Sequence, residues 1–338
     1  MAASEPFREA LEHGGRLAAA MAAYPHAPRP WMDLSTGINP EPWRGQRASL
    51  DALGRLPDPA RIAELEAVAG ATFGVADPAR VVATAGAETA LRWLPFLLGA
   101  GGVEIVSPTY GGHERAWAVA GRQVRQITPE ALAASSAEAV VLVNPNNPDG
   151  RIVARDALAE AIEARSGRGL WTIVDESFVE TRPELSVAGL TADRLVVLRS
   201  FGKFYGLAGL RLGFMVAAPD VAARLRQVQG DWPVGAEAVS MGLRAYADTA
   251  WQARTRAELQ RRAGELDGQL ARAGLAVIGG TSLFRLVCTQ DAAAVFDRLC
   301  HAGVLTRPFP MRGDWLRFGL PAQEDVSRLA IALRRVAA

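Results

Sequence analysis

Short apolar runs alternate with amphipathic segments along the first two thirds of the chain. The runs are rich in Val, Ile and Leu and predict buried strands, whereas the amphipathic segments predict helices. The predicted strands cover residues 81–86, 103–110, 139–145, 170–176 and 194–200, and the predicted helices cover residues 61–74, 88–98, 113–120 and 156–164. Apolar strands that alternate with helices indicate a parallel sheet with helices on both faces, so we expect an α/β fold.

The pattern changes after Trp232. Arg- and Ala-rich helical stretches are followed by an apolar segment, a helix, a short strand and a closing helix, at residues 236–273, 275–288, 291–302, 315–320 and from 324 onward. This order predicts a smaller α+β domain. We therefore expect an N-terminal arm and helix over residues 1–45 that joins the small domain, a large domain over 46–232, and the small domain over 233–338, with a Pro- and Gly-containing boundary near 231–235.

Composition narrows the class of protein. The chain has 338 residues, of which 49% are hydrophobic and 22% charged, as in globular proteins, and its formal net charge is +1. No overall field attracts nucleic acid or an acidic membrane, so we expect neither partner. The two cysteines, Cys288 and Cys300, cannot form a disulfide framework or a four-ligand zinc site. With no secretory signal and no apolar run of membrane-spanning length, we expect a cytoplasmic protein.

Polar signatures follow three of the predicted strands: NPNNPDG at 144–150, DES at 175–177 and SFGK at 200–203. Ligands of open parallel sheets bind outside the carboxyl ends of the strands. The sequence therefore places its unusual polar residues where a ligand site is expected.

Lys203 is the only lysine in the chain, and it lies between Phe201 and Phe204 in a segment with little charge. An apolar pocket disfavours the ammonium form of lysine and makes its amine nucleophilic, as a Schiff base to a cofactor requires. The alternative is an ordinary surface charge.

Other strand ends offer complementary groups. Asp175 is either a cap or ion-pair partner, or a carboxylate that faces a pyridinium nitrogen and keeps it protonated. Asn147 is either a turn residue ahead of Pro148 or an amide donor to a ring oxygen. Tyr110 is either a packing aromatic or a ring that stacks on the cofactor.

A phosphate site is predicted from two further features. Arg211, eight residues after Lys203 (211 − 203), suits a phosphate clamp, and Ser200 adds a hydroxyl. The turn at 84–90 precedes a helix, and its small residues leave backbone N–H groups accessible to an anion at the helix N-terminus.

The motifs NPNNPDG, VDES, SFGK and GLAGLRLGF together resemble the fold-type I aminotransferase superfamily, class I/II, in its histidinol-phosphate aminotransferase branch. HGGRL at 13–17 and MDLSTGINP at 32–40 resemble the L-threonine O-3-phosphate decarboxylase family of cobalamin biosynthesis. The resemblance implies the pyridoxal 5'-phosphate (PLP) transferase fold, with a mainly parallel seven-stranded sheet between helices and a smaller α+β domain. It also implies PLP as cofactor, a small phosphorylated amino acid as substrate, and a homodimer.

The resemblance also implies roles for individual residues. Lys203 carries PLP, Asp175 pairs with the pyridine nitrogen, Asn147 bonds the 3-oxygen, Tyr110 stacks on the ring, and Arg317 binds the substrate carboxylate. The cofactor phosphate is surrounded by Gly86, Ala87, Glu88, Ser200 and Arg211. Candidates for the substrate phosphate are His13, Arg16, Arg29 and Arg55, each of which has a surface charge as its alternative.

Three positions depart from the family pattern. Phe178 stands where a tyrosine is usual, which removes a donor to the cofactor 3-oxygen. Leu56, in RLPDP, stands where a tyrosine often reaches the neighbouring subunit's cofactor, and Arg55 is a partial replacement. Arg16 follows HGG where asparagine is common.

The expected reaction is decarboxylation of L-threonine O-3-phosphate to (R)-1-amino-2-propanol O-2-phosphate and CO2. A histidinol-phosphate-like aminotransferase would use the same cofactor residues. An inactive PLP-fold binding protein is the third possibility, against which the retention of Lys203, Asp175 and Arg211 argues.

Overall fold

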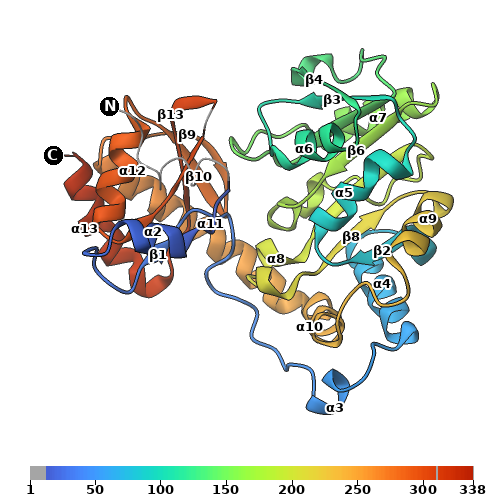
Figure 1. Cartoon of the computed structure of the whole chain (residues 1–338), viewed down its shortest axis with the longest axis horizontal. Helices are drawn as coiled ribbons and strands as arrows, with labels where there is room; N and C mark the ends of the chain where they lie inside the picture. Colours follow the sequence, from blue (N-terminus) through green and yellow to red (C-terminus); the bar gives the residue numbers. More distant parts are fainter. Residues whose placement is uncertain (1–12, 310, 338) are drawn as a thin grey trace. The chain divides into compact units, whose positions relative to one another are not determined.

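The computed structural model describes residues 13–309 and 311–337, so expectations for residues 1–12 lie outside the described residues (Figure 1). The chain forms two compact units. The large unit comprises Pro42–Asn147 and Arg151–Gln252, and the small unit comprises, of the described residues, 13–41, Pro148–Gly150, 253–309 and 311–337.

The large unit is built on one seven-stranded sheet. Its strands, in spatial order, are β2 (Val81–Thr84), β8 (Gly213–Val216), β7 (Leu195–Ser200), β6 (Trp171–Asp175), β5 (Ala139–Val143), β3 (Gly102–Val106) and β4 (Gln123–Ile127). Only β8 runs antiparallel to its neighbours, β2 and β7. The expected mainly parallel seven-stranded sheet is therefore confirmed.

Helices cover both faces of this sheet, because the strands are apolar on both sides. The helices that share one continuous apolar layer with the strands are α5 (Ala87–Leu97), α6 (Gly112–Val119) and α9 (Pro219–Gln229). Elsewhere α7 (Arg155–Ser166) packs against β6, and α4 (Pro59–Phe73) packs against β2 and α10 (Ala236–Ala247). Truncating a side chain in such a layer, such as Leu94→Ala, typically costs about 2–5 kcal/mol of stability.

The parallel register brings several polar residues to one edge of the sheet. Asp175 ends β6 opposite Val143 of β5 and Leu198 of β7. The short helix α8 (Phe201–Phe204), which carries Lys203, begins directly after β7. The carboxyl ends of three adjacent strands therefore supply the predicted polar signatures, as the sequence indicates.

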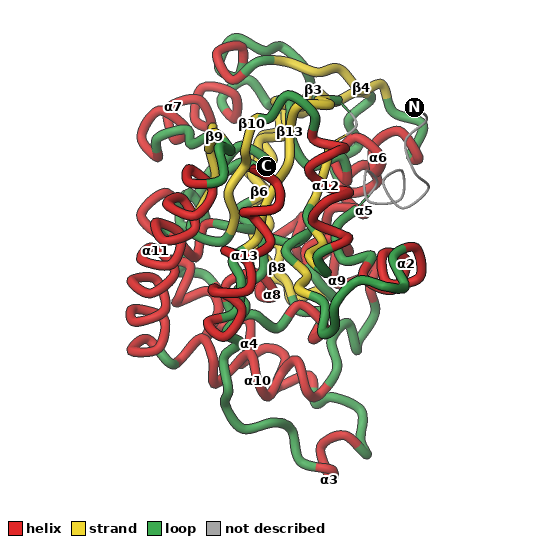
Figure 2. Tube along the Cα trace, turned by 90° about the vertical axis from the view of Figure 1, so that its left-hand side faces the viewer, coloured by secondary structure: helices red, strands yellow, loops and turns green. Residues whose placement is uncertain are grey.

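The small unit contains an antiparallel four-stranded sheet, of which β9, β10 and β13 are labelled in Figure 2, and a two-stranded parallel pair. The four-stranded sheet has the order β12 (Arg307–Phe309), β13 (Arg312–Gly319), β10 (Phe284–Cys288) and β9 (Ala276–Thr281), and the pair is β1 (Met32–Asp33) with β11 (Val304–Leu305). The helices of this unit are α2 (Leu17–Ala23), α12 (Ala292–His301), α13 (Val326–Ala337) and most of α11 (Thr249–Arg272). An antiparallel sheet together with these helices confirms the expected smaller α+β part.

Some elements differ from the sequence prediction. The units divide within α11, after the predicted boundary at 231–235, because α10 packs on α4 of the large unit. Strands β4 and β8 were not predicted, and the apolar segment 275–288 is a hairpin of β9 and β10. The division into functional domains at 45 and 232 stays a prediction. Among the described residues, no helix combines the length and apolar character that crossing a membrane requires.

Candidate active site

Asp175 is buried at the carboxyl end of β6 and is bonded to a histidine. His113 Nε2 lies 3.0 Å from Asp175 Oδ2, and both side chains are almost fully buried. The other carboxylate oxygen, Oδ1, accepts hydrogen bonds from the backbone N–H and the hydroxyl of Ser177, at 2.9 and 2.5 Å. Burial alone would raise the pKa of Asp175, but the bonds from His113 and Ser177 outweigh it and hold the pKa below its ordinary value. Asp175 is therefore a fixed, ionised carboxylate.

His113 was missed by the sequence analysis, which used it only to mark a helix. It lies three residues after Tyr110 (113 − 110), and the two rings meet edge to face at 6.1 Å between centroids. The available signal was a histidine at the start of a helix that follows an apolar strand. Its partner is 62 residues away in sequence, so no local pattern identifies the pair.

Lys203 lies half-buried on α8, in an aromatic setting. Phe201 and Phe204, which flank it, are buried, and Tyr205 stacks on Phe201 at 4.4 Å between centroids. The Lys203 ammonium lies 5.9 Å from the centroid of the Phe178 ring. The structure places one aromatic ring near this lysine, and an apolar pocket around it stays a prediction.

The N-terminus of α5 forms an open cradle beside Arg211. Gly86 precedes the helix with φ of 87°, and a Cβ there would lie 2.6 Å from Arg211 Nη2. Arg211 itself has φ of 54°, an uncommon backbone for a non-glycine residue. Ser200 pairs with Gly213, where a Cβ would lie 2.2 Å from the backbone nitrogen of Ala87. The N-terminus of α5, the Arg211 guanidinium and the backbone of the strand end that carries Ser200 therefore lie together, an arrangement that suits a phosphate.

Glu88 does not present its carboxylate freely to that cradle. Its oxygens accept hydrogen bonds from Arg92 Nε at 2.8 Å and from the Tyr110 hydroxyl at 3.1 Å. Burial and the charge of Glu88 raise the pKa of Tyr110 to about 12, so the phenol stays neutral. Glu88 thus orients the Tyr110 ring, and any contact of this residue with a phosphate would come from its backbone.

Asn147 is half-buried at the end of a loop that its neighbours fix. Asn144 exchanges two hydrogen bonds of 3.0 Å with the backbone of Val153. Asn146 accepts a bond from Thr109 at 2.6 Å and donates one to the carbonyl of Pro108 at 2.9 Å. These contacts tie the loop after β5 to the segment that carries Tyr110.

Arg317 is buried on β13 of the small unit. Its Nη2 donates to the carbonyl oxygen of Ser35 at 2.9 Å, and its Cζ lies 5.0 Å from the centroid of the Phe284 ring. Arg307 stands directly opposite it on β12. Burial and the charge of Arg307 lower the pKa of Arg317 to about 9. Two guanidiniums on one face of a sheet favour an anion between them, and the sequence analysis missed Arg307.

The arm motifs HGG and DLSTG come together at Ser35, whose carbonyl oxygen accepts the hydrogen bond from Arg317. A Cβ on Gly14 would lie 2.4 Å from the carbonyl oxygen of Ser35, and Gly15 N–H donates to the Ser35 hydroxyl at 2.7 Å. Asp33 Oδ1 accepts bonds from Ser35, at 2.9 Å from the backbone nitrogen and 2.5 Å from the hydroxyl. HGG and DLSTG therefore meet at Ser35.

The remaining sequence candidates are less constrained. His13 is half-buried, directly before Gly14. Arg55 is exposed in the large unit and forms an ion pair of 2.9 Å with Asp51. Leu56 is also exposed, and Phe178 is buried.

Comparisons with known proteins agree with this geometry. The family model of aminotransferase class I and II matches residues 31–336. Threonine-phosphate decarboxylases from Sinorhizobium sp and Pseudomonas aeruginosa are 40% and 37% identical, over 96% of this chain and 98% and 97% of their own. A crystal structure of histidinol-phosphate aminotransferase from Sinorhizobium meliloti in complex with pyridoxal-5'-phosphate has a TM-score of 0.80 at 20% identity, covering 100% of this chain and 98% of that one, a likeness of fold. The chain belongs to the aminotransferase class I and II family.

Proposed function

We propose that this chain decarboxylates L-threonine O-3-phosphate to (R)-1-amino-2-propanol O-2-phosphate and CO2, with PLP as cofactor. The relatives of matching length carry the name threonine-phosphate decarboxylase. The observation that carries the proposal is the meeting of HGG, DLSTG and Arg317 at Ser35, because it joins the decarboxylase-like motifs to a buried cation.

The residues of the large unit fit PLP. The cradle of Gly86, Ala87, Ser200 and Arg211 supplies cationic and N–H groups for a phosphate. Asp175 is a fixed carboxylate that would hold a pyridine nitrogen in its protonated form. Tyr110 would stack on the ring, and the Asn147 amide would donate to the 3-oxygen. Phe178 has no hydroxyl to donate, so the 3-oxygen of the cofactor would depend on the Asn147 amide for a hydrogen bond.

Each residue has a defined task in the reaction. PLP, when bound, supplies the electron sink for the pair left on the α-carbon as CO2 departs. Lys203 would hold the cofactor through Nζ, and in its ammonium form it would be the group placed to return a proton to the α-carbon. A substrate carboxylate whose orientation Arg317 fixed would favour loss of CO2 over loss of the α-proton.

Recognition of the substrate is assigned to the small unit. Arg317 would bind an acidic group of the substrate through its planar guanidinium. Arg307 and His13 add cationic or donor groups for the second acidic group. Arg55 is less suited, because it is exposed and already paired with Asp51.

Product analysis tests the proposal. The PLP-loaded protein is incubated with L-threonine O-3-phosphate, and CO2 release is followed without any keto acid. L-Threonine serves as the matched substrate that lacks the phosphate. A parallel reaction contains histidinol phosphate and 2-oxoglutarate and is assayed for glutamate. CO2 from the phosphorylated substrate supports the decarboxylase, whereas glutamate without CO2 moves the chain to the aminotransferases.

We also propose a cytoplasmic homodimer that acts in cobalamin biosynthesis. Leu50 and Leu53 of α3 (Leu50–Leu53) and the nearby Leu56 are 86%, 51% and 67% exposed. Three exposed leucines on one short segment favour an apolar contact with a second copy of the chain. Sedimentation should give a dimer that Leu50→Ser with Leu53→Ser weakens. A monomeric wild-type protein would refute the dimer.

A further inference from the structure

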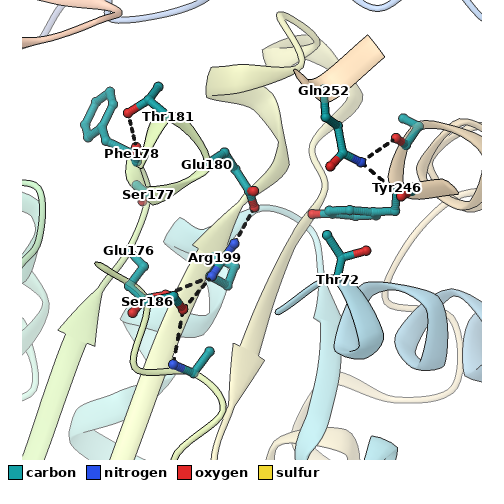
Figure 3. Close-up of polar contacts among 12 residues, drawn as sticks. Thr72, Glu176, Ser177, Phe178, Glu180, Thr181, Ser186, Arg199, Tyr246 and Gln252 are labelled. Atoms are coloured by element: carbon teal, nitrogen blue, oxygen red, sulfur yellow. Dashed lines mark hydrogen bonds and ion pairs between the residues drawn. The ribbon is translucent and has the colours of Figure 1, made fainter. Parts of the chain in front are cut away.

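Arg199 is fully buried near the end of β7, between the sheet and a short polar segment. Its guanidinium forms two ion pairs, from Nη1 to Glu176 Oε2 at 2.8 Å and from Nη2 to Glu180 Oε1 at 2.5 Å (Figure 3). Nη1 also donates to the Ser186 hydroxyl at 3.0 Å, and Cζ lies 4.1 Å from the centroid of the Phe73 ring. Both terminal nitrogens of the guanidinium are therefore bonded, and its plane packs on an aromatic ring.

The two glutamates flank the residues that touch the proposed cofactor groups. Ser177, directly after Glu176, donates two hydrogen bonds to Asp175. Phe178 follows, with its ring 5.9 Å from the Lys203 ammonium. Arg199 thus fixes both ends of a five-residue segment, 176–180, whose middle contacts Asp175 and Lys203.

The geometry of the pairing requires arginine. One planar guanidinium can bridge two carboxylates with separate N–H groups, whereas a lysine ammonium is a single point charge. Burial raises the pKa of Glu176 even though Arg199 and three hydrogen bonds act against it, so holding this cluster ionised is costly. A buried ion network adds little stability over apolar packing, so stability alone does not account for the cluster.

We infer that Arg199 is a positioning residue: through Glu176 and Glu180 it holds Ser177 against Asp175 and Phe178 beside the Lys203 amine. It acts through these side chains and not by contact with substrate. The inference rests on the proposed role of Lys203 as the cofactor lysine, but it does not depend on which reaction follows.

Arg199→Lys is the main test, because it keeps the positive charge and removes the planar guanidinium that bridges the two carboxylates. The readout is the visible absorption band of the Lys203-bound cofactor, titrated with pH in the absence of substrate. We expect its midpoint to move by about half a pH unit or more relative to wild type. We also expect kcat to fall about tenfold while KM changes less than about twofold. The spectrum is read without turnover, so failure of the proposed reaction leaves this test intact.

Arg165→Lys is the matched control. Arg165 is equally buried in the same unit, but it contacts the opposite end of β6 at Trp171. Its replacement should lower stability and leave the midpoint of the band unchanged. If Arg199→Lys alters only stability, as Arg165→Lys does, the positioning role is refuted.

Glu180 provides a second route should Arg199→Lys fail to fold. Glu180→Ala removes the far end of the clamp and leaves the pair between Arg199 and Glu176. It should move the midpoint of the band in the same way, and Glu180→Gln, which keeps an acceptor for Arg199, should restore most of the wild-type midpoint. A wild-type midpoint and kcat in Glu180→Ala would overturn the inference.

Discussion

The large unit contains two fully buried arginines at opposite ends of its sheet, and their partners differ. Arg165 donates to the carbonyl oxygens of Ser135, Ala137 and Trp171, and burial lowers its pKa to about 10. Burial acts in the same direction on Arg199, but the charges of Glu180 and Glu176 raise its pKa overall. Neutral acceptors therefore hold Arg165 at the amino end of β6, whereas carboxylates hold Arg199 at the carboxyl end of β7, a few residues from Lys203. The comparison separates a supporting end from a reacting end.

The largest effect should come from the reacting end. Lys203→Ala removes the amine proposed to bind PLP and to return the proton, so turnover should fall at least about a thousandfold. Stability should change little, because the deleted ammonium is half-buried in an aromatic setting. Turnover of L-threonine O-3-phosphate and urea unfolding check both expectations. Retained turnover would remove Lys203 from the centre of the site.

At the supporting end we expect the opposite result, a loss of stability without a change at the cofactor. Arg165→Met leaves two buried carbonyl groups and one partly buried carbonyl group without this donor and should lower the free energy of unfolding by about 3 kcal/mol. The cofactor band of the folded fraction should be unaltered. Arg168→Met is the matched control, because Arg168 lies three residues after Arg165 (168 − 165) but its hydrogen bonds are mostly exposed. This change should lower the free energy of unfolding by less than about 0.5 kcal/mol. Equal losses in the two variants would contradict the support role.

His113→Phe sharpens the electrostatic side of the comparison. Asp175 has a lowered pKa, so its contribution to stability is present above the ordinary carboxyl pKa and is lost as pH falls through the lowered value. Without His113, burial dominates and the pKa of Asp175 rises. The variant should then lose stability at neutral pH and regain part of it as pH falls, because the raised pKa favours the protonated native form; urea unfolding at several pH values checks this, and kcat should fall about tenfold.

The control for that variant is His301→Phe. His301 is exposed and lies 3.7 Å from Asp297, a surface pair. This change should leave the pH profiles of unfolding and kcat at their wild-type positions. If both histidine variants behave alike, the bond between His113 and Asp175 has no special effect.

The smallest effect is expected at Phe178. Phe178→Tyr adds a hydroxyl within reach of the Lys203 region and should move the pH midpoint of the cofactor band by about half a unit or less. Phe204→Tyr, in the neighbouring aromatic cluster, should affect stability only. An unchanged midpoint in Phe178→Tyr would mean that the ring edge points away from the cofactor oxygen.

The sequence predicted the parts of the fold that local pattern determines. Apolar runs identified β5, β6 and β7, and the polar residues after them identified the carboxyl edge. Strand β4 (QVRQI) is polar and lies at the edge of the sheet, so it lacks the apolar run by which the other strands were predicted. Strand β8 is short, and the Gly-rich motif before it reads as a loop.

Site residues were predicted where residue type and local motif were enough to suggest a role. They were missed where the role depends on a partner far away in the sequence. Lys203 and Arg211 stand out by residue type and spacing. His113, Arg307 and Arg199 become meaningful only beside Asp175, Arg317 and the two glutamates. Arg199 had a detectable signal in the sequence, because it is a charged residue near the end of the apolar run RLVVLRS. A charged residue inside a buried strand needs a partner, but sequence does not say which one.

The single lysine makes the chain convenient to probe chemically. An enzyme that cleaves only after lysine would cut the unfolded protein once, into pieces of 203 and 135 residues (338 − 203). Borohydride reduction would fix the cofactor to Lys203 as a secondary amine and block that cut. The ratio of whole to divided chain on a gel would then report the fraction of molecules that carried the cofactor, with no substrate and no assay of turnover.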